Sequence, residues 1–147
     1  MTRADDSSVA LQDRPGIARQ LGGDIFVSIH CNAMPRRNEG HGTETWYYFM
    51  ESKCLGLIMQ NSLVRSLQRV DRGTKFARFW VIRHGEIPAV LVELMFLNDD
   101  REEALLQRDA VRDSAAGAIA EGLREYVEGT GSVAARTDGG VGLRRLP

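Results

Sequence analysis

Two apolar stretches of the chain each carry a side chain that can do acid–base or metal chemistry. Residues 24–33 read DIFVSIHCNA, and residues 88–98 read PAVLVELMFLN. His30 follows the first apolar run, and Glu93 interrupts the second. An imidazole can bind a metal ion or a substrate. A carboxylate among apolar residues is desolvated, and desolvation raises its pKa toward the range of a general base. The two residue types therefore suggest a metal ligand and a proton-transfer group.

Each of these residues also has a purely structural interpretation. His30 can be a strand-end histidine whose ring is hydrogen-bonded to a nearby carbonyl. Glu93 can form a structural ion pair with an arginine such as Arg83. Spacing alone does not decide between the chemical and the structural interpretations, so both stay open from the residues.

The two stretches have the pattern of buried strands in a parallel sheet. Continuous apolar runs bounded by turn residues are typical of such strands. A pair of glycines precedes the first run and Pro35 follows it, while Pro88 opens the second. Ligand sites in these sheets lie beyond the carboxyl ends of the strands. We therefore expect His30 and Glu93 on one rim of a mainly parallel, twisted α/β sheet flanked by helices.

The remaining pattern predicts the elements that complete a single domain. Aromatic and β-branched residues predict a strand over 42–49, and helical periodicity predicts helices over 51–69 and 109–127. A looser alternation predicts a strand over 76–82. The predicted domain spans residues 1–128, and residues 129–147, rich in glycine and polar residues, are predicted to be a flexible tail or linker.

Composition excludes several classes of function. A length of 147 residues with 43% hydrophobic content suits one globular domain. A net charge of −1 gives no electrostatic case for nucleic-acid binding. No apolar run reaches membrane-spanning length, and this chain carries no signal-peptide pattern at its N-terminus. Two cysteines do not make a disulfide framework or a zinc knuckle.

Five ordered blocks of sequence resemble the zinc-dependent N-acetylmuramoyl-L-alanine amidases of the amidase type 3 group. The resemblance runs from Thr2 to about Val127, and its order and spacing are more specific than any single motif. The blocks are Thr2-Arg3 with Asp6, Leu11, Arg14 and Ala18; Phe26 to Asn32; Gly42 to Tyr48; Arg72 to Lys75 with Ala77, Phe79 and Val81 to Arg83; and Pro88 to Asn98.

The resemblance implies a function. Members of this family hydrolyse peptidoglycan at the amide between N-acetylmuramic acid and the L-alanine of the stem peptide, using zinc-activated water. By motif, His30 is implied to be a zinc ligand, Glu93 the catalytic acid and base, and Asn32 a weaker candidate for substrate contact. The resemblance also implies action outside the cytoplasm, in the periplasm or cell wall, and leaves room for an unidentified regulatory partner.

One departure from the family concerns the metal. The family takes its other two zinc ligands from a "DPGHGG"-like motif and from a glutamate on the following helix. Neither occurs in this chain, which predicts a domain that is N-terminally truncated relative to the family. A catalytic zinc commonly has three protein ligands, so activity of this chain alone stays open. Substitute ligands are conceivable at Cys31, His41, Glu44, His84 and Glu86, but none has convincing spacing.

Four hypotheses therefore compete. The chain is a piece of a true amidase, a non-catalytic relative that binds the wall or regulates another amidase, or an active enzyme with a rebuilt metal site. The fourth hypothesis, a cytosolic α/β module with Cys31 as nucleophile and His84 as base, leaves the five matching blocks unexplained. The first is preferred.

Overall fold

The computed structural model describes residues 1–3 and 5–137, with side chains described as far as residue 129. A four-stranded sheet in the order β1-β4-β2-β3 forms its centre. β1 (Phe26–Asn32) runs parallel to β4 (Ala89–Phe96), and β2 (Thr43–Tyr47) runs parallel to β3 (Asp71–Phe76). β2 and β4 pair antiparallel, which makes the sheet mixed. The predicted α/β fold with flanking helices is confirmed.

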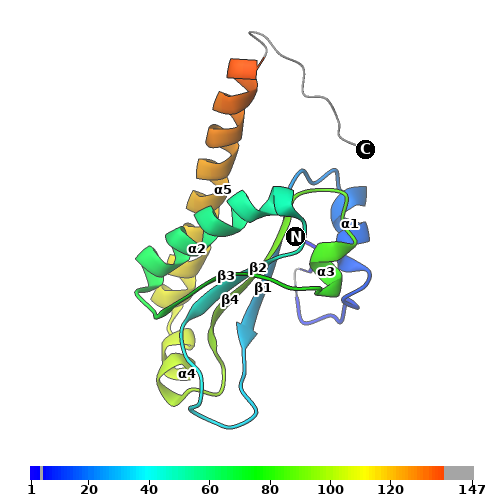
Figure 1. The fold of residues 1–147 in the computed structure, drawn as a ribbon. Helices are drawn as coiled ribbons and strands as arrows, with labels where there is room; N and C mark the ends of the chain where they lie inside the picture. Colours follow the sequence, from blue (N-terminus) through cyan, green and yellow to red (C-terminus); the bar gives the residue numbers. More distant parts are fainter. Residues whose placement is uncertain (4, 138–147) are drawn as a thin grey trace.

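Helices cover the two faces of the sheet unequally (Figure 1). The long helices α2 (Lys53–Leu67) and α5 (Asp109–Thr137) cover one face, and the short helices α1 (Arg14–Gln20) and α3 (Trp80–Arg83) lie on the other side. A 3-10 turn, η1 (Met50–Ser52), precedes α2, and α4 (Asp100–Leu106) follows β4. None of the described helices has the length and hydrophobicity needed to cross a membrane. Because α1 and α3 are short, they leave part of their face uncovered.

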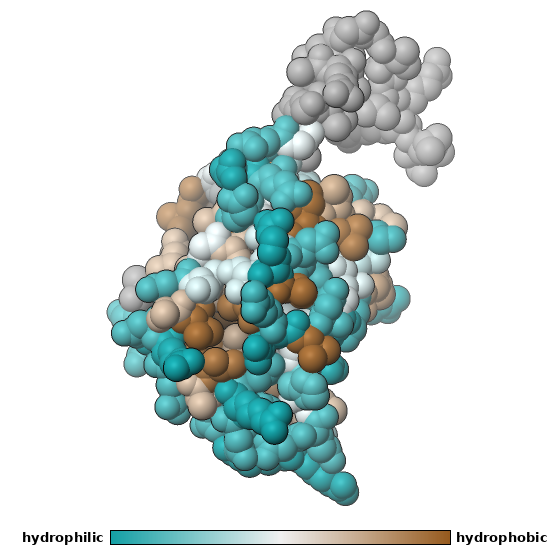
Figure 2. All heavy atoms as spheres, turned by 90° about the vertical axis from the view of Figure 1, so that its left-hand side faces the viewer, coloured by the Kyte–Doolittle hydropathy of each residue, from teal (hydrophilic) through white to brown (hydrophobic). Residues whose placement is uncertain are grey.

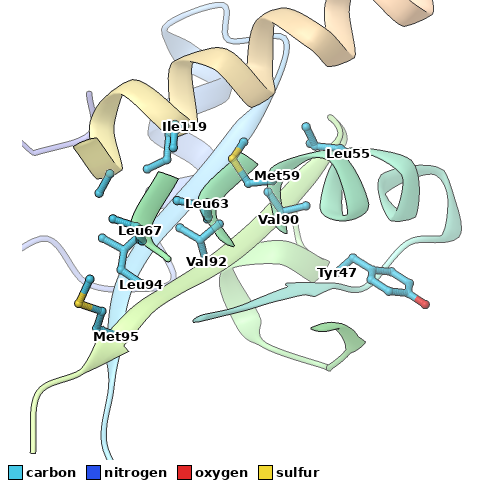
Figure 3. Close-up of a cluster of buried hydrophobic side chains, with 12 residues drawn as sticks. Tyr47, Leu55, Met59, Leu63, Leu67, Val90, Val92, Leu94, Met95 and Ile119 are labelled. Atoms are coloured by element: carbon cyan, nitrogen blue, oxygen red, sulfur yellow. The ribbon is translucent and has the colours of Figure 1, made fainter. Parts of the chain in front are cut away.

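The main core lies between the sheet and the two long helices (Figure 3). On α2, apolar residues recur every four positions, which places them on one stripe. The members of this stripe are Leu55, Met59, Leu63 and Leu67. They pack against Val90 and Val92 of β4 and Ile119 of α5. Burying each large side chain contributes about 1.5–3 kcal/mol, so this layer fixes the sheet on which the polar residues stand.

The predicted strand over 76–82 is wrong. β3 ends at Phe76, and residues 80–83 form α3 instead. The loose alternation arose because Val81 and Ile82 of α3 are both buried beneath β1 and β4. Gly73 lies inside β3 with a positive φ of 82°, where the pairing with β2 shifts register.

Helix α5 continues past the predicted domain boundary. It was expected to end at residue 127 and extends to Thr137, within the segment predicted to be a tail. The rest of that segment, residues 138–147, lies outside the described residues. The boundary at residue 128 itself stays a prediction.

β1 is not the fully buried strand that its sequence predicted. Among the described strands it pairs only with β4, and the side chain of Ile29 is 55% exposed. A hollow of about 460 Å³ lies on one side of β1, and an apolar one of about 230 Å³ lies on the other. On the side of α2 and α5, hydrophobic residues reach the surface beside a hydrophilic band (Figure 2). An apolar run predicts burial only if both neighbours of the strand are present.

Among the described glycines, Gly42 combines a positive φ with the closest approach of another backbone atom. Its φ is +107°, and an added Cβ would lie 2.5 Å from the carbonyl oxygen of Val70. We expect Gly42→Ala to lower the free energy of unfolding by about 2 kcal/mol, because backbone strain and a backbone clash act together. Gly73→Ala is the matched control: φ is +82° but no atom lies within 4 Å. Gly73→Ala should lower the free energy of unfolding by about 1 kcal/mol. Urea denaturation of both variants checks this, and equal losses would contradict the clash.

Candidate functional site

Three titratable side chains form a row across the sheet. His30 of β1 pairs with Glu93 of β4, and Glu93 pairs with Glu44 of β2. Directly paired residues point to the same face of a sheet. Residues an even number of positions earlier on the same strands point to the same face. Among these, Phe26, Ala89 and Leu91 pack with Val81 and Ile82 of α3. The row therefore stands on the face that the short helices leave partly uncovered. Both strands extend beyond the row, to Asn32 and Phe96.

Glu93 is a half-buried carboxylate with an unsatisfied oxygen. Its Oε2 is buried and has no hydrogen-bond partner among the described residues. Burial, and secondly the charge of Glu44, raises the pKa of Glu93 to about 7. This is the direction expected from its sequence context. Such a carboxyl group can both accept and donate a proton near neutral pH.

The alternative role for Glu93, a structural ion pair with Arg83, is not found. Nε of Arg83 is itself buried without a partner among the described residues, and the guanidinium lies 5.2 Å from the centre of the Trp80 ring. Glu93 thus keeps its free oxygen, and its desolvation is not compensated by a cation.

His30 has the protonation state of a metal-ligating histidine. Its Nε2 lies 2.8 Å from the Oγ of Ser28. Burial, and secondly the positive charge of Arg14, lowers the pKa of His30 below its usual value. The ring is therefore neutral at pH 7, the form that binds metals. The structural interpretation of His30 assumed a hydrogen bond to a carbonyl, whereas the ring is hydrogen-bonded to the hydroxyl of Ser28.

Glu44 is the site residue whose role the sequence did not reveal. Its side chain is only 3% exposed. Its Oε1 accepts a hydrogen bond from Nδ2 of Asn32 at 2.7 Å, and its Oε2 accepts from Arg72 at 2.9 Å and Lys75 at 2.6 Å. Burial would raise the pKa of Glu44, but the hydrogen bonds from Lys75 and Arg72 outweigh it and hold the pKa below its usual value. Glu44 is therefore a permanently charged neighbour of Glu93.

Asn32 is tied into this network. Besides its bond to Glu44, its Oδ1 accepts from the backbone N–H of Ala33 at 2.8 Å. Asn32 follows His30 by two positions on β1, so both side chains point to the same face of the sheet. Its main visible role is to link β1 to β2, and substrate contact by Asn32 stays a prediction.

The described residues do not complete a zinc site. No cluster of three histidine, cysteine or acidic side chains within the described part of the chain could hold a metal ion. Two of the conceivable substitutes are engaged elsewhere: His84 stacks on Trp80, and Glu86 pairs with Arg19. His30 and Glu93 offer a nitrogen and an oxygen that could bind a metal ion, but a catalytic zinc commonly needs three protein ligands.

The cysteine-based alternative finds no support in the geometry. Cys31 packs with the core on the side of α2 and α5, the face opposite His30. Burial, and secondly the charge of Glu93, raises the pKa of its thiol, whereas a nucleophilic cysteine needs a lowered pKa. Nδ1 of His84 donates to the carbonyl oxygen of Trp80, and His84 makes no described contact with Cys31.

Comparison with known proteins gives a consistent result. The family model for N-acetylmuramoyl-L-alanine amidase matches residues 1–125. The chain is 35% identical over 130 residues to the amidase LytC of Bacillus subtilis, which covers 86% of this chain and 26% of LytC. It is 33% identical over 135 residues to the endolysin of Bacillus phage SPP1, covering 86% of this chain and 49% of the endolysin. The chain thus spans between a quarter and a half of the length of these two relatives.

Solved structures agree. The catalytic domain of CwlV, an amidase from Bacillus (Paenibacillus) polymyxa, superposes with a TM-score of 0.82 at 35% identity, covering 86% of this chain and 70% of that domain. An N-acetylmuramoyl-L-alanine amidase from Clostridium difficile 630 also gives 0.82, at 34% identity, covering 86% and 69% of the two chains.

Proposed function

The chain belongs to the N-acetylmuramoyl-L-alanine amidase family, and on that premise we propose that it takes part in hydrolysis of the amide between N-acetylmuramic acid and the L-alanine of the peptidoglycan stem. The observation that carries the proposal is Glu93, a half-buried carboxyl group with a pKa near 7 and a free oxygen on an open face of the sheet. Because several relatives are described as cell wall amidases, we further propose that it acts outside the cytoplasm.

In this proposal Glu93 moves the proton. The ionised carboxylate takes a proton from the attacking water as the water oxygen bonds to the amide carbon. When the carbon–nitrogen bond breaks, the carboxyl group returns that proton to the departing amine of L-alanine. The products are the lactyl carboxylic acid of the sugar and a free amino terminus. A pKa of about 7 suits both halves of this cycle at neutral pH.

For the cofactor we propose zinc, with His30 as one ligand. The neutral ring of His30 supports this choice. The described residues do not fit a complete zinc site, so the other ligands would have to come from outside them.

Zinc retention tests, independently of activity, whether the chain holds the ion without ligands from outside the described residues. We expect the purified 147-residue chain, after dialysis, to hold well below one zinc ion per chain by elemental analysis, because a single histidine cannot hold the ion tightly. The His30→Ala variant should then hold no less zinc than the parent chain. Near-stoichiometric zinc that is lost in His30→Ala would contradict the expectation and show that the chain completes the site itself.

A non-catalytic wall-binding or regulatory role is the second function that the sequence suggested. Binding alone does not need a desolvated carboxyl group with a pKa near 7, so no observation favours this alternative. A regulatory partner protein stays a prediction.

A further inference from the structure

Arg72 and Lys75 of β3 contact Glu44 from the strand on the other side of β2. Lys75 donates to Oε2 of Glu44 at 2.6 Å, and the Nε of Arg72 donates to the same oxygen at 2.9 Å. Glu44 in turn lies directly opposite Glu93. Directly opposed residues of antiparallel strands have Cβ atoms about 5 Å apart. Because β2 lies between β4 and β3, Glu44 separates the two cations from the proposed proton-transfer group on this face of the sheet.

Aromatic rings and the buried carboxylate hold both cations in fixed positions. The ammonium of Lys75 lies 5.1 Å from the centre of the Trp46 ring, and the guanidinium of Arg72 lies 5.0 Å from the centre of the Phe96 ring. Contacts of this kind orient a cation without neutralising it. Arg72 also donates from Nη1 to the carbonyl oxygen of His41 at 3.3 Å. Neither side chain is free to swing away from the site.

The two cations share one partner. The salt bridges of Arg72 and Lys75 both go to the same oxygen, Oε2 of Glu44. The side chains of Arg72 and Lys75 remain 32% and 35% exposed. An ammonium has three donors and a guanidinium has five, so both can bind another acceptor from the solvent side. One cation would be enough to neutralise the charge of the buried Glu44.

We infer that Arg72 and Lys75, positioned by Glu44, form a subsite for a carboxylate group of the substrate. The inference rests on the proposed function, in which the substrate is a muramoyl peptide. Stem peptides carry free carboxylates beyond the first amide, and the cations next to Glu44 would hold such a group while the amide lies at the carboxyl group of Glu93. A charge-assisted contact also fixes the direction in which the peptide leaves the site.

The test compares two ligands of the same shape, one with free carboxylates and one with none. N-acetylmuramoyl-L-alanyl-D-glutamic acid and its α,γ-diamide are titrated into the full chain by calorimetry. We expect the parent chain to bind the acid about 10-fold more tightly than the amide. Lys75→Met keeps an unbranched side chain and removes the charge, so it should cancel most of that preference. Lys53→Met, at an exposed lysine of α2, is the control and should leave the preference unchanged.

The outcomes separate this inference from the proposed function. Equal affinity of the parent chain for acid and amide overturns the subsite and leaves the amidase proposal intact. An equal loss for both ligands in Lys75→Met also overturns it, because a structural role would affect both. Binding of neither ligand by the parent chain contradicts the amidase proposal itself. Far-ultraviolet circular dichroism of each variant confirms that the compared chains are folded.

Discussion

Replacing Glu93 with glutamine should lower the rate of muramoyl-amide hydrolysis by about 10³-fold, because an amide side chain of the same shape cannot take the proton from water. The rate is measured as release of new amino termini from purified peptidoglycan. Glu125→Gln, at an exposed position of α5, is the matched control and should retain the parent rate. A Glu93→Gln variant that keeps a tenth or more of the activity would remove Glu93 from the mechanism.

The same substitution has a second effect that does not depend on activity. The pKa of Glu93 in the folded chain is about 7, above the value of 4.5 for a free side chain. Between these values the folded chain binds more protons than the unfolded chain, so its stability falls as the pH rises from about 4.5 to about 7. Glutamine has no such penalty. Allowing for partial exposure to solvent, Glu93→Gln should be more stable than the parent by about 2 kcal/mol at pH 8.

Urea denaturation at several pH values checks this effect. The advantage of Glu93→Gln should disappear near pH 4, where the parent carboxyl group is protonated in both states. A constant difference between pH 4 and pH 8 would mean that the glutamine acts through packing and not through the charge of Glu93.

The sequence predicted one half of the candidate site and missed the other for a physical reason. His30 and Glu93 end or interrupt apolar runs, and two parallel strands place such residues on a common rim, so local pattern was sufficient to bring them together. The position of Glu44 depends on the antiparallel pairing of β2 with β4. No local pattern states which strand lies next to β4 or in which direction it runs, so Glu44 was visible only as one acid among several.

The same distinction explains where the fold prediction failed. The stripe on α2 was readable because its partners are determined by the helix period itself. The segment 76–82 was misread because Val81 and Ile82 owe their burial to β1 and β4 and not to strand alternation. The apolar run of β1 predicted two covered sides, but the described strands cover only one. Contacts between distant segments decided each of these cases.

Replacing Glu44 with alanine should lower the free energy of unfolding by about 3 kcal/mol at pH 7. Removing one partner of a buried ion pair costs about 3–5 kcal/mol, and the lower end applies because Arg72 and Lys75 are each about one-third exposed. Asn32 also loses its acceptor. Glu125→Ala, which removes an exposed carboxylate from α5, should change stability by less than about 0.5 kcal/mol.

The pH dependence separates the charge of Glu44 from its packing. Its pKa is lowered in the folded chain, so its contribution is present above the unfolded value of about 4.5 and is lost as the pH falls through the folded value. The deficit of Glu44→Ala should therefore shrink in acid. A double-mutant cycle with Lys75→Met gives a second check. The double variant should lose less unfolding free energy than the sum of the losses of the two single variants, because both substitutions remove the same contact. Two outcomes would contradict this: a stability deficit that persists unchanged in acid, or strictly additive losses. Either would mean that Glu44 stabilises the fold by filling space and does not hold Arg72 and Lys75 in place.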